Sequence, residues 1–210
     1  MPDIQTVLLF VTASIVLLVI PGPTIALVIA RSLSEGRRVA LPLVLGVGLG
    51  DLVAATLALA GAGALLAASA TAFTAVKVIG AIYLIWLGIK LFMAEPTPPT
   101  VDAANSKVGG LDAFRDGFLV TVFNPKGILF FIAFVPQFIE PDKSYIAQAS
   151  FFVIAFTVLG IVNGAVYAFG ADALRTVIRS SQVLRRMNQA GGVVIAAAGI
   201  AALFTKRPAI

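Results

Sequence analysis

Long apolar runs with few or no charges follow one another along most of the chain. A charge at the centre of a membrane helix costs about 2.5–3.5 kcal/mol, so such runs are typical of membrane spans. About 20 helical residues cross the hydrocarbon layer, and the run from 39 to 89 is therefore divided in two at a polar dip near Thr71. Six spans are predicted, at 4–30, 39–70, 71–89, 117–139, 144–171 and 187–205.

Features of the first three spans recur in the same order in the last three. Spans one and four are each interrupted by proline, at 21–24 and 124–127. Spans two and five share small residues four apart, and spans three and six share glycines eight apart. Three spans per repeat give the repeats opposite orientations, as in inverted-repeat transporters. We therefore predict an all-α membrane protein of six transmembrane helices, built as two inverted three-helix repeats with proline-broken helices one and four. Chance matching of glycine-rich membrane helices is the alternative.

The repeats set the domain organisation. Repeat one covers about 4–93 and repeat two about 114–205. The segment between them, about 94–113, is polar, rich in Pro and Gly and without apolar periodicity, which is typical of a linker. We expect residues 1–210 to form a single membrane transport domain.

The loops on the two sides differ in charge. Those after spans one, three and five carry ten Lys and Arg, whereas the opposite side carries three. Cytoplasmic loops of membrane proteins hold the excess of Lys and Arg, so we expect both termini to lie outside.

Composition narrows the possible functions. Hydrophobic residues make up 60% of the 210 residues and charged residues 12%, against about 45–50% and about 25% in soluble domains. The chain has no Cys and no His, which removes thiolate and imidazole metal ligands, dithiol redox chemistry and the usual base of nucleophilic catalysis. We therefore expect no enzyme activity, no metal site and no cofactor. Basic residues flanking the spans explain the net charge of +5 without a nucleic-acid partner.

The proline breaks are the first candidates for a binding site. Proline removes a backbone donor and displaces the carbonyl about four residues earlier, and hydrocarbon cannot satisfy the polar groups that remain. Such groups are tolerated only where they meet protein, water or a ligand. A new helix starting near Thr24 points free N–H groups into the interior, where they can bind a carboxylate. A packing kink is the alternative for this break.

Two ionisable residues lie deep in the predicted spans. Lys126 is about 15 Å from either end of its span, so it pairs with Asp51, binds an anionic group of a substrate or exchanges its proton during transport. Asp51 lies about 20 Å along a helix from Arg38, and burial favours its neutral form, so it is the first candidate for loading and releasing a proton. A hydrogen bond between helices is the alternative for Asp51 and an equal one for Asn163. The predicted substrate- or proton-binding residues are Pro21, Gly22, Pro23, Thr24, Asp51, Asn124, Pro125, Lys126 and Asn163.

Motifs spread over nearly the whole chain resemble those of one bacterial family. They are, in order, Pro21-Gly22-Pro23; Gly46-x-Gly48-x-Gly50-Asp51; Lys77-x-x-Gly80-Ala81-x-Tyr83-Leu84 with Gly88; Phe114-x-x-Gly117 followed by Asn124-Pro125-Lys126; and Arg185-Arg186 before Gly191 and Gly199. In this combination the chain resembles the lysine exporter and homoserine/threonine resistance (LysE/RhtB) family of amino-acid exporters.

The resemblance implies a multi-pass secondary transporter of the bacterial cytoplasmic (inner) membrane. It implies export of amino acids or close analogues in exchange for protons, by alternating access. The partners implied are an amino acid, protons and membrane lipid, and the glycine stripes leave a homodimer open. The alternatives are an inorganic cation exporter or channel of the same superfamily and a non-transporting membrane scaffold. A single intramembrane carboxylate without His offers too few ligands for a metal ion, which disfavours the first alternative. A scaffold needs no buried Lys and Asp, which disfavours the second.

Overall fold

Helices make up the regular structure of the described chain. The computed structural model describes residues 2–68, 70–95, 109–140, 143–170 and 180–204, and every regular element within them is helical. The all-α prediction is therefore confirmed for these residues. The elements are α1 (Ile4–Val19), α2 (Pro23–Glu35), α3 (Arg37–Ala68), α4 (Ala70–Met93), α5 (Gly110–Val122), α6 (Pro125–Leu129), the π-helical turn η1 (Phe130–Phe134), the 3-10 turn η2 (Val135–Phe138), α7 (Tyr145–Gly170) and α9 (Ser181–Phe204).

Some of these helices qualify as membrane spans by length and composition. Within the described residues, α3 and α7 each contain a stretch long and apolar enough to cross a membrane. Two bent pairs raise the number to four if each pair is one span. In these pairs α2 is bent from α1 by 53°, and the run that starts at α6 is bent from α5 by 41°. Both bends fall at the predicted proline breaks, whereas the full six-span inverted repeat stays a prediction.

The segment expected as a linker is partly helical. Most of it lies outside the described residues, but α5 begins at Gly110, earlier than the predicted start of repeat two near residue 114. The sequence pattern treats Gly109 and Gly110 as chain breakers. In the structure Gly109 is the extended N-cap of α5, and a Cβ on Gly110 would lie 3.2 Å from Pro42 of α3. These glycines thus start a helix that packs closely on its neighbour.

Local chemistry explains where several helices begin and end. Asp3 caps α1, because its carboxylate accepts a hydrogen bond of 2.8 Å from the backbone N–H of Thr6. Pro23 and Pro125 each occupy the first turn of a helix, where a missing N–H leaves no gap in the hydrogen-bond ladder. Gly36 has φ of 70°, a left-handed conformation that glycine adopts without strain, and it ends α2 before the chain turns into α3.

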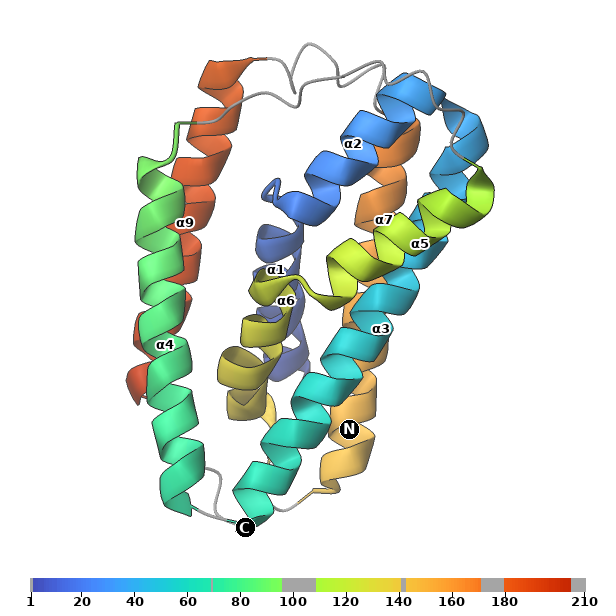
Figure 1. The fold of residues 1–210 in the computed structure, drawn as a ribbon. Helices are drawn as coiled ribbons and strands as arrows, with labels where there is room; N and C mark the ends of the chain where they lie inside the picture. Colours follow the sequence, from blue (N-terminus) through green and yellow to red (C-terminus); the bar gives the residue numbers. More distant parts are fainter. Residues whose placement is uncertain (1, 69, 96–108, 141–142, 171–179, 205–210) are drawn as a thin grey trace.

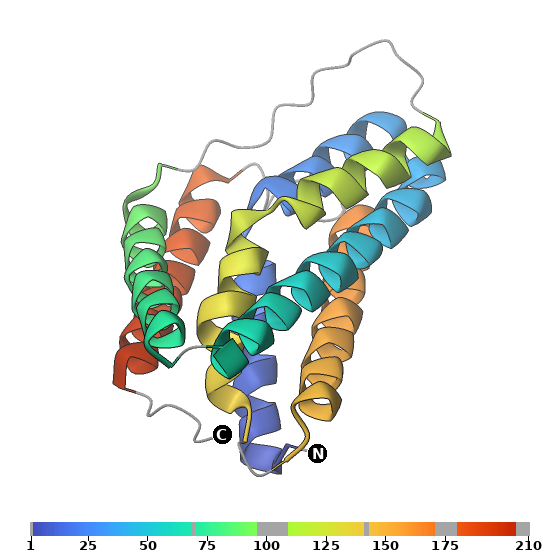
Figure 2. The same cartoon turned by 60° about the horizontal axis from the view of Figure 1, so that its bottom comes forward.

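The helices form three groups, as Figures 1 and 2 show. α1 and the run from α6 to η2 lie in the middle, α4 packs along α9 on one flank, and α3 packs against α5 and α7 on the other. Glycines permit the close contacts within the flanks. A Cβ on Gly88 would overlap the backbone of Gly192, and a Cβ on Gly46 would overlap the carbonyl of Phe114. Small residues allow membrane helices to approach in this way.

An aromatic cluster fills the interior between α1, the α6–η2 run and α7. Its closest rings, those of Phe10 and Phe152, have centroids 4.7 Å apart. The cluster, named the phenylalanine cluster below, consists of Phe10, Phe130, Phe131, Phe134, Phe138, Phe152 and Phe156. The outer faces of the helices also carry large apolar side chains, and these are exposed. Such a surface suits a lipid environment.

Several helices begin or end at one of the two opposite ends of the bundle. The ends of α2 and α4 and the starts of α3, α5 and α9 lie together at one end, whereas α1 starts and α9 finishes at the other (Figure 1). The ends of α2 and α4 and the starts of α3, α5 and α9, which flank the three loops with the excess of Lys and Arg, thus all belong to the first of these ends.

Candidate functional site

The first break, between α1 and α2, leaves four successive backbone carbonyls without helical partners. In an uninterrupted helix the carbonyls of residues 17–20 accept from the N–H groups of residues 21–24. Pro21 and Pro23 have no N–H, and Gly22 is extended, with φ of −119° and ψ of −169°. The hydrogen-bond ladder therefore stops here. We name the freed group the carbonyl cradle; it consists of the backbone carbonyls of Leu17, Leu18, Val19 and Ile20.

The ammonium group of Lys126 occupies two positions of the carbonyl cradle. Its Nζ donates to the carbonyl of Leu17 over 2.8 Å and to the carbonyl of Ile20 over 3.0 Å. Lys126 comes from the second break, more than a hundred residues away in sequence. A cation is thus placed where the proline break has created unpaired acceptors.

Two side chains of α7 satisfy the remaining positions of the cradle. Asn163 Nδ2 donates to the carbonyl of Leu18 over 3.1 Å, and the hydroxyl of Tyr167 donates to the carbonyl of Val19 over 2.8 Å. Asn163 therefore makes the hydrogen bond between helices that was one of its two expected roles. Sequence reasoning missed Tyr167. The signal was its position one helical turn after Asn163, which puts both polar groups on one face of α7.

The second break makes two hydrogen bonds within its own segment and contacts the first break. Asn124 Oδ1 caps α6 by accepting from the backbone N–H of Lys126 over 3.1 Å, and its own N–H donates to the carbonyl of Thr121 over 3.0 Å. Its Nδ2 donates to Thr24 Oγ1 over 3.1 Å, and the hydroxyl of Thr121 donates to the same atom over 3.4 Å. Thr24 and Asn124 are both buried, so the two breaks are tied together inside the protein.

Asp51 is the second ionisable residue near the breaks. It lies on α3, is 9% exposed, and its carboxyl faces Gly160 of α7, where a Cβ would overlap it. Within the described part of the chain it makes no hydrogen bond and no ion pair. The pairing of Asp51 with Lys126 that the sequence allowed is therefore not formed here.

A small cavity lies between the two breaks. Its volume is about 30 Å³, room for about one water molecule. Six of the nine predicted site residues line it: Gly22, Thr24, Asp51, Asn124, Lys126 and Asn163. The other three, Pro21, Pro23 and Pro125, create the breaks. The structure thus brings all nine predicted residues to one place, and the remaining side chains of the lining are apolar.

The N-terminus of α2 opens on this cavity. Its N-cap, Gly22, offers no side-chain acceptor, so the N–H groups of Thr24 and Ile25 have no side-chain cap. A helix N-terminus carries a partial positive charge and favours an anion. The cavity therefore presents N–H donors at one point of its wall and oxygen acceptors at others.

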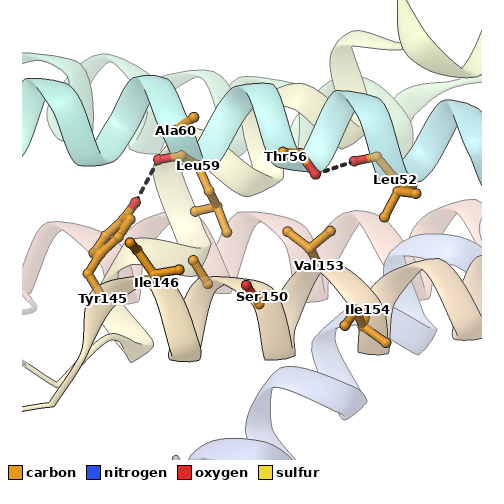
Figure 3. A pocket seen from close by; sticks show the side chains of 10 residues that line it. Leu52, Thr56, Leu59, Ala60, Tyr145, Ile146, Ser150, Val153 and Ile154 are labelled. Carbon is orange, nitrogen blue, oxygen red and sulfur yellow. Dashed lines mark hydrogen bonds between the residues drawn. The ribbon is translucent and has the colours of Figure 1, made fainter.

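A larger groove between α3 and α7 lacks this chemistry (Figure 3). Its volume is about 380 Å³ and it is mostly apolar, with Leu52 and Ile154 exposed. The hydroxyls of Thr56 and Tyr145 donate to backbone carbonyls of α3, both over 2.6 Å. The described residues that line the groove include no Asp, Glu, Lys or Arg, so they offer no charge to a charged solute.

A sequence comparison decides the family. The family model described as LysE type translocator matches residues 15–206. The chain belongs to this family. The resemblance drawn from the motifs is thus confirmed, and a translocator family agrees with the expectation that the chain is not an enzyme.

Relatives of this LysE type translocator come from several bacteria. It is 34% identical over 202 residues to an uncharacterized membrane protein of Vibrio cholerae serotype O1, with 94% of this chain and 96% of that protein covered. It is 31% identical over 160 residues to the leucine efflux protein of Salmonella typhimurium, with 76% and 74% covered. No solved structure matches the chain.

Proposed function

We propose that this LysE type translocator exports amino acids from the bacterial cytoplasm in exchange for protons. The observation that carries the proposal is the buried, unpaired carboxyl of Asp51 beside a cavity bounded by two helix breaks from opposite halves of the chain. Burying an ionisable group within a membrane is costly, so such groups are as a rule functional. Asp51 is the group that loads and releases the proton.

The relatives and the cavity both favour an amino acid as the solute. Relatives 31% identical to the chain are named leucine efflux proteins. A zwitterion needs donors for its carboxylate and acceptors for its amino group. The uncapped start of α2 supplies the donors, and the carboxyl of Asp51 and the backbone carbonyls of the first break supply the acceptors.

The cavity is too small for any amino acid, so solute binding requires the two halves to move. We propose that two contacts close the cavity. On the side of the basic loops, Arg31 of α2 pairs with Asp116 of α5 over 2.8 Å, and on the other side the phenylalanine cluster fills the interior. We propose that two inverted repeats rock about the breaks and open these closures in turn. In the inner membrane the basic end faces the cytoplasm and both termini face outside.

Export of an inorganic cation has less support. A metal ion of this kind is bound by several oxygen or nitrogen ligands. Among the described residues there is no group of three or more Asp, Glu, His or Cys that could hold one. Of the described residues on the cavity wall, Asp51 is the only acidic one.

The proposal is tested with purified protein in vesicles that are acid inside. Outward proton flow then drives accumulation of L-leucine by the wild type. Asp51→Asn keeps the size of the side chain and removes the titratable proton, so accumulation falls to that of protein-free vesicles, while the variant inserts normally. Asp112→Asn, at an exposed carboxylate of α5, is the matched control and accumulates leucine like the wild type. Full accumulation by Asp51→Asn would remove this residue from the coupling.

A further inference from the structure

The carbonyl cradle has the chemistry of a binding site for a primary ammonium group. Lys126 Nζ is such a group, and it is held by two cradle oxygens at 2.8 and 3.0 Å. These oxygens lack helical N–H partners because of the proline break, whether or not Lys126 is present. An ammonium on a flexible stem is also a replaceable occupant, since it binds as a point charge through rotatable donors. The amino group of a free amino acid carries the same three N–H donors.

Two glycines near Lys126, Gly22 and Gly127, place no side chain in the way of its movement. Gly22 lies beside the ammonium, and a Cβ there would be 3.4 Å from Nζ, so glycine leaves the neighbourhood of the group unobstructed. Gly127, the next residue of the break, has nothing within 4 Å of where its Cβ would lie. Lys126 and Asp51 line the same cavity, so the displaced ammonium has a carboxyl within the same enclosure.

The charges at the cavity determine the result of such a movement. Within the described chain, Asp51 and Lys126 are the only Asp, Glu, Lys or Arg on its wall, and α1, α2 and α7 contribute none. Tyr167 is the remaining ionisable group at the cradle, and its hydroxyl is engaged with Val19. A buried carboxylate without a partner is costly, so Asp51 keeps a proton while Lys126 occupies the cradle.

We propose that the amino group of the substrate displaces the ammonium of Lys126 from the carbonyl cradle and that the displaced ammonium pairs with Asp51, which releases its proton. The inference rests on the proposed function and adds a binding site and a coupling step to it. The amino acid enters as a zwitterion without net charge and one proton leaves the Asp51 carboxyl for water, so the positive charge that the site loses is carried away by the proton. Return of the proton to Asp51 sends Lys126 back to the cradle and expels the substrate. Coupling is thus one proton for each amino acid.

Binding of L-leucine to purified protein tests the exchange, because the variants change it in opposite directions. Wild type releases one proton for each leucine bound, measured with a pH indicator in weak buffer. Lys126→Met removes the competing ammonium, so leucine binds at least as tightly as to wild type and no proton is released. Asp51→Asn leaves the displaced Lys126 without a carboxylate, so leucine binds about tenfold or more weakly. The double variant recovers binding, again without proton release.

Recovery of binding in the double variant is the result that a merely structural role of Lys126 does not produce. If Lys126 instead binds the substrate carboxylate or only supports the fold, then Lys126→Met weakens leucine binding both alone and together with Asp51→Asn. That outcome would overturn the proposal. Proton release by Lys126→Met equal to that of wild type would overturn it as well.

Methylammonium tests the cradle without any amino acid. Lys126→Ala leaves two carbonyls of the cradle unpaired, and we expect millimolar methylammonium to raise its thermal unfolding temperature. Tetramethylammonium has no N–H donors and is the control; it leaves the temperature unchanged, and wild type responds to neither cation. Absence of a methylammonium effect on Lys126→Ala contradicts the ammonium site. If methylammonium stabilises Lys126→Ala but wild type binds no leucine, the cradle is supported and the failure belongs to the proposed substrate.

Discussion

The two helix breaks, which lie in predicted spans one and four, receive their hydrogen bonds in different ways. The second break is capped from within its own segment, because Asn124 Oδ1 caps α6 and the backbone N–H of Asn124 donates to the carbonyl of Thr121. The first break depends on the other half of the chain, because every carbonyl of its cradle accepts from Lys126 or from α7. The second break thus supplies a donor, the ammonium of Lys126, and the first break supplies the carbonyls that accept from it.

This difference indicates which part of the molecule responds to movement. A shift of the second half relative to α1 leaves the Asn124 cap of α6 intact and removes donors from the first break. Hydrocarbon cannot replace those donors, so a solute or water must do so. We therefore expect that movement of the two halves changes solute binding at the first break. Substitutions that affect only one of the two breaks should then change solute binding and folding to different extents.

Pro23→Ala, at the first break, is expected to have the largest effect on leucine accumulation. It restores an N–H that can donate to the carbonyl of Val19, so α1 can continue into α2 and the cradle loses its open geometry. We expect normal insertion and a loss of leucine accumulation of about tenfold or more, since a displacement of about 1 Å in a site can cost this much. Pro42→Ala, at a proline inside α3, is the control and keeps accumulation. Wild-type accumulation by Pro23→Ala would favour a simple packing kink.

Gly160→Ala tests whether the position of the Asp51 carboxyl matters for transport. Its Cβ would overlap the carboxyl of Asp51, which must move, so we expect leucine accumulation to fall several-fold with little change in protein yield. Gly164→Ala is the matched control one helical turn away, where a Cβ meets Val44 at 3.7 Å, an ordinary contact. Equal activity of the two variants would show that the position of the Asp51 carboxyl is not critical.

Tyr167→Phe measures the dependence of the first break on its donors. It leaves the carbonyl of Val19 without a partner, and we expect unfolding to require about 1–3 kcal/mol less free energy. Tyr145→Phe also removes a hydroxyl from a carbonyl, that of Leu59, but this carbonyl lies inside α3 and keeps a helical partner, so the loss is about 1 kcal/mol or less. Denaturation of the purified variants compares them, and equal losses would contradict a special need for donors at the break.

The sequence predicted the breaks better than it predicted what fills them. Proline acts on the residues beside it, so interruptions at 21–24 and 124–127 follow from local chemistry. The contact between Lys126 and the carbonyls of Leu17 and Ile20 depends on how two distant segments meet, and no local pattern encodes that. For the same reason the sequence left three roles open for Lys126. At Gly109 and Gly110 the local pattern indicates a linker, whereas the structure has the start of a helix, because glycine is common both in linkers and at close helix contacts.

The central claim is that the cavity between the breaks is a solute path reached from each side of the membrane in turn. The chain has no Cys, so a single Val47→Cys variant places one thiol on the cavity wall. We expect a membrane-impermeant thiol reagent to modify this thiol both in intact cells and in inverted vesicles, and we expect leucine to slow both reactions. Ile154→Cys, in the larger groove between α3 and α7, is the control and shows no protection by leucine. Modification of Val47→Cys from only one side, or from neither, would contradict the account.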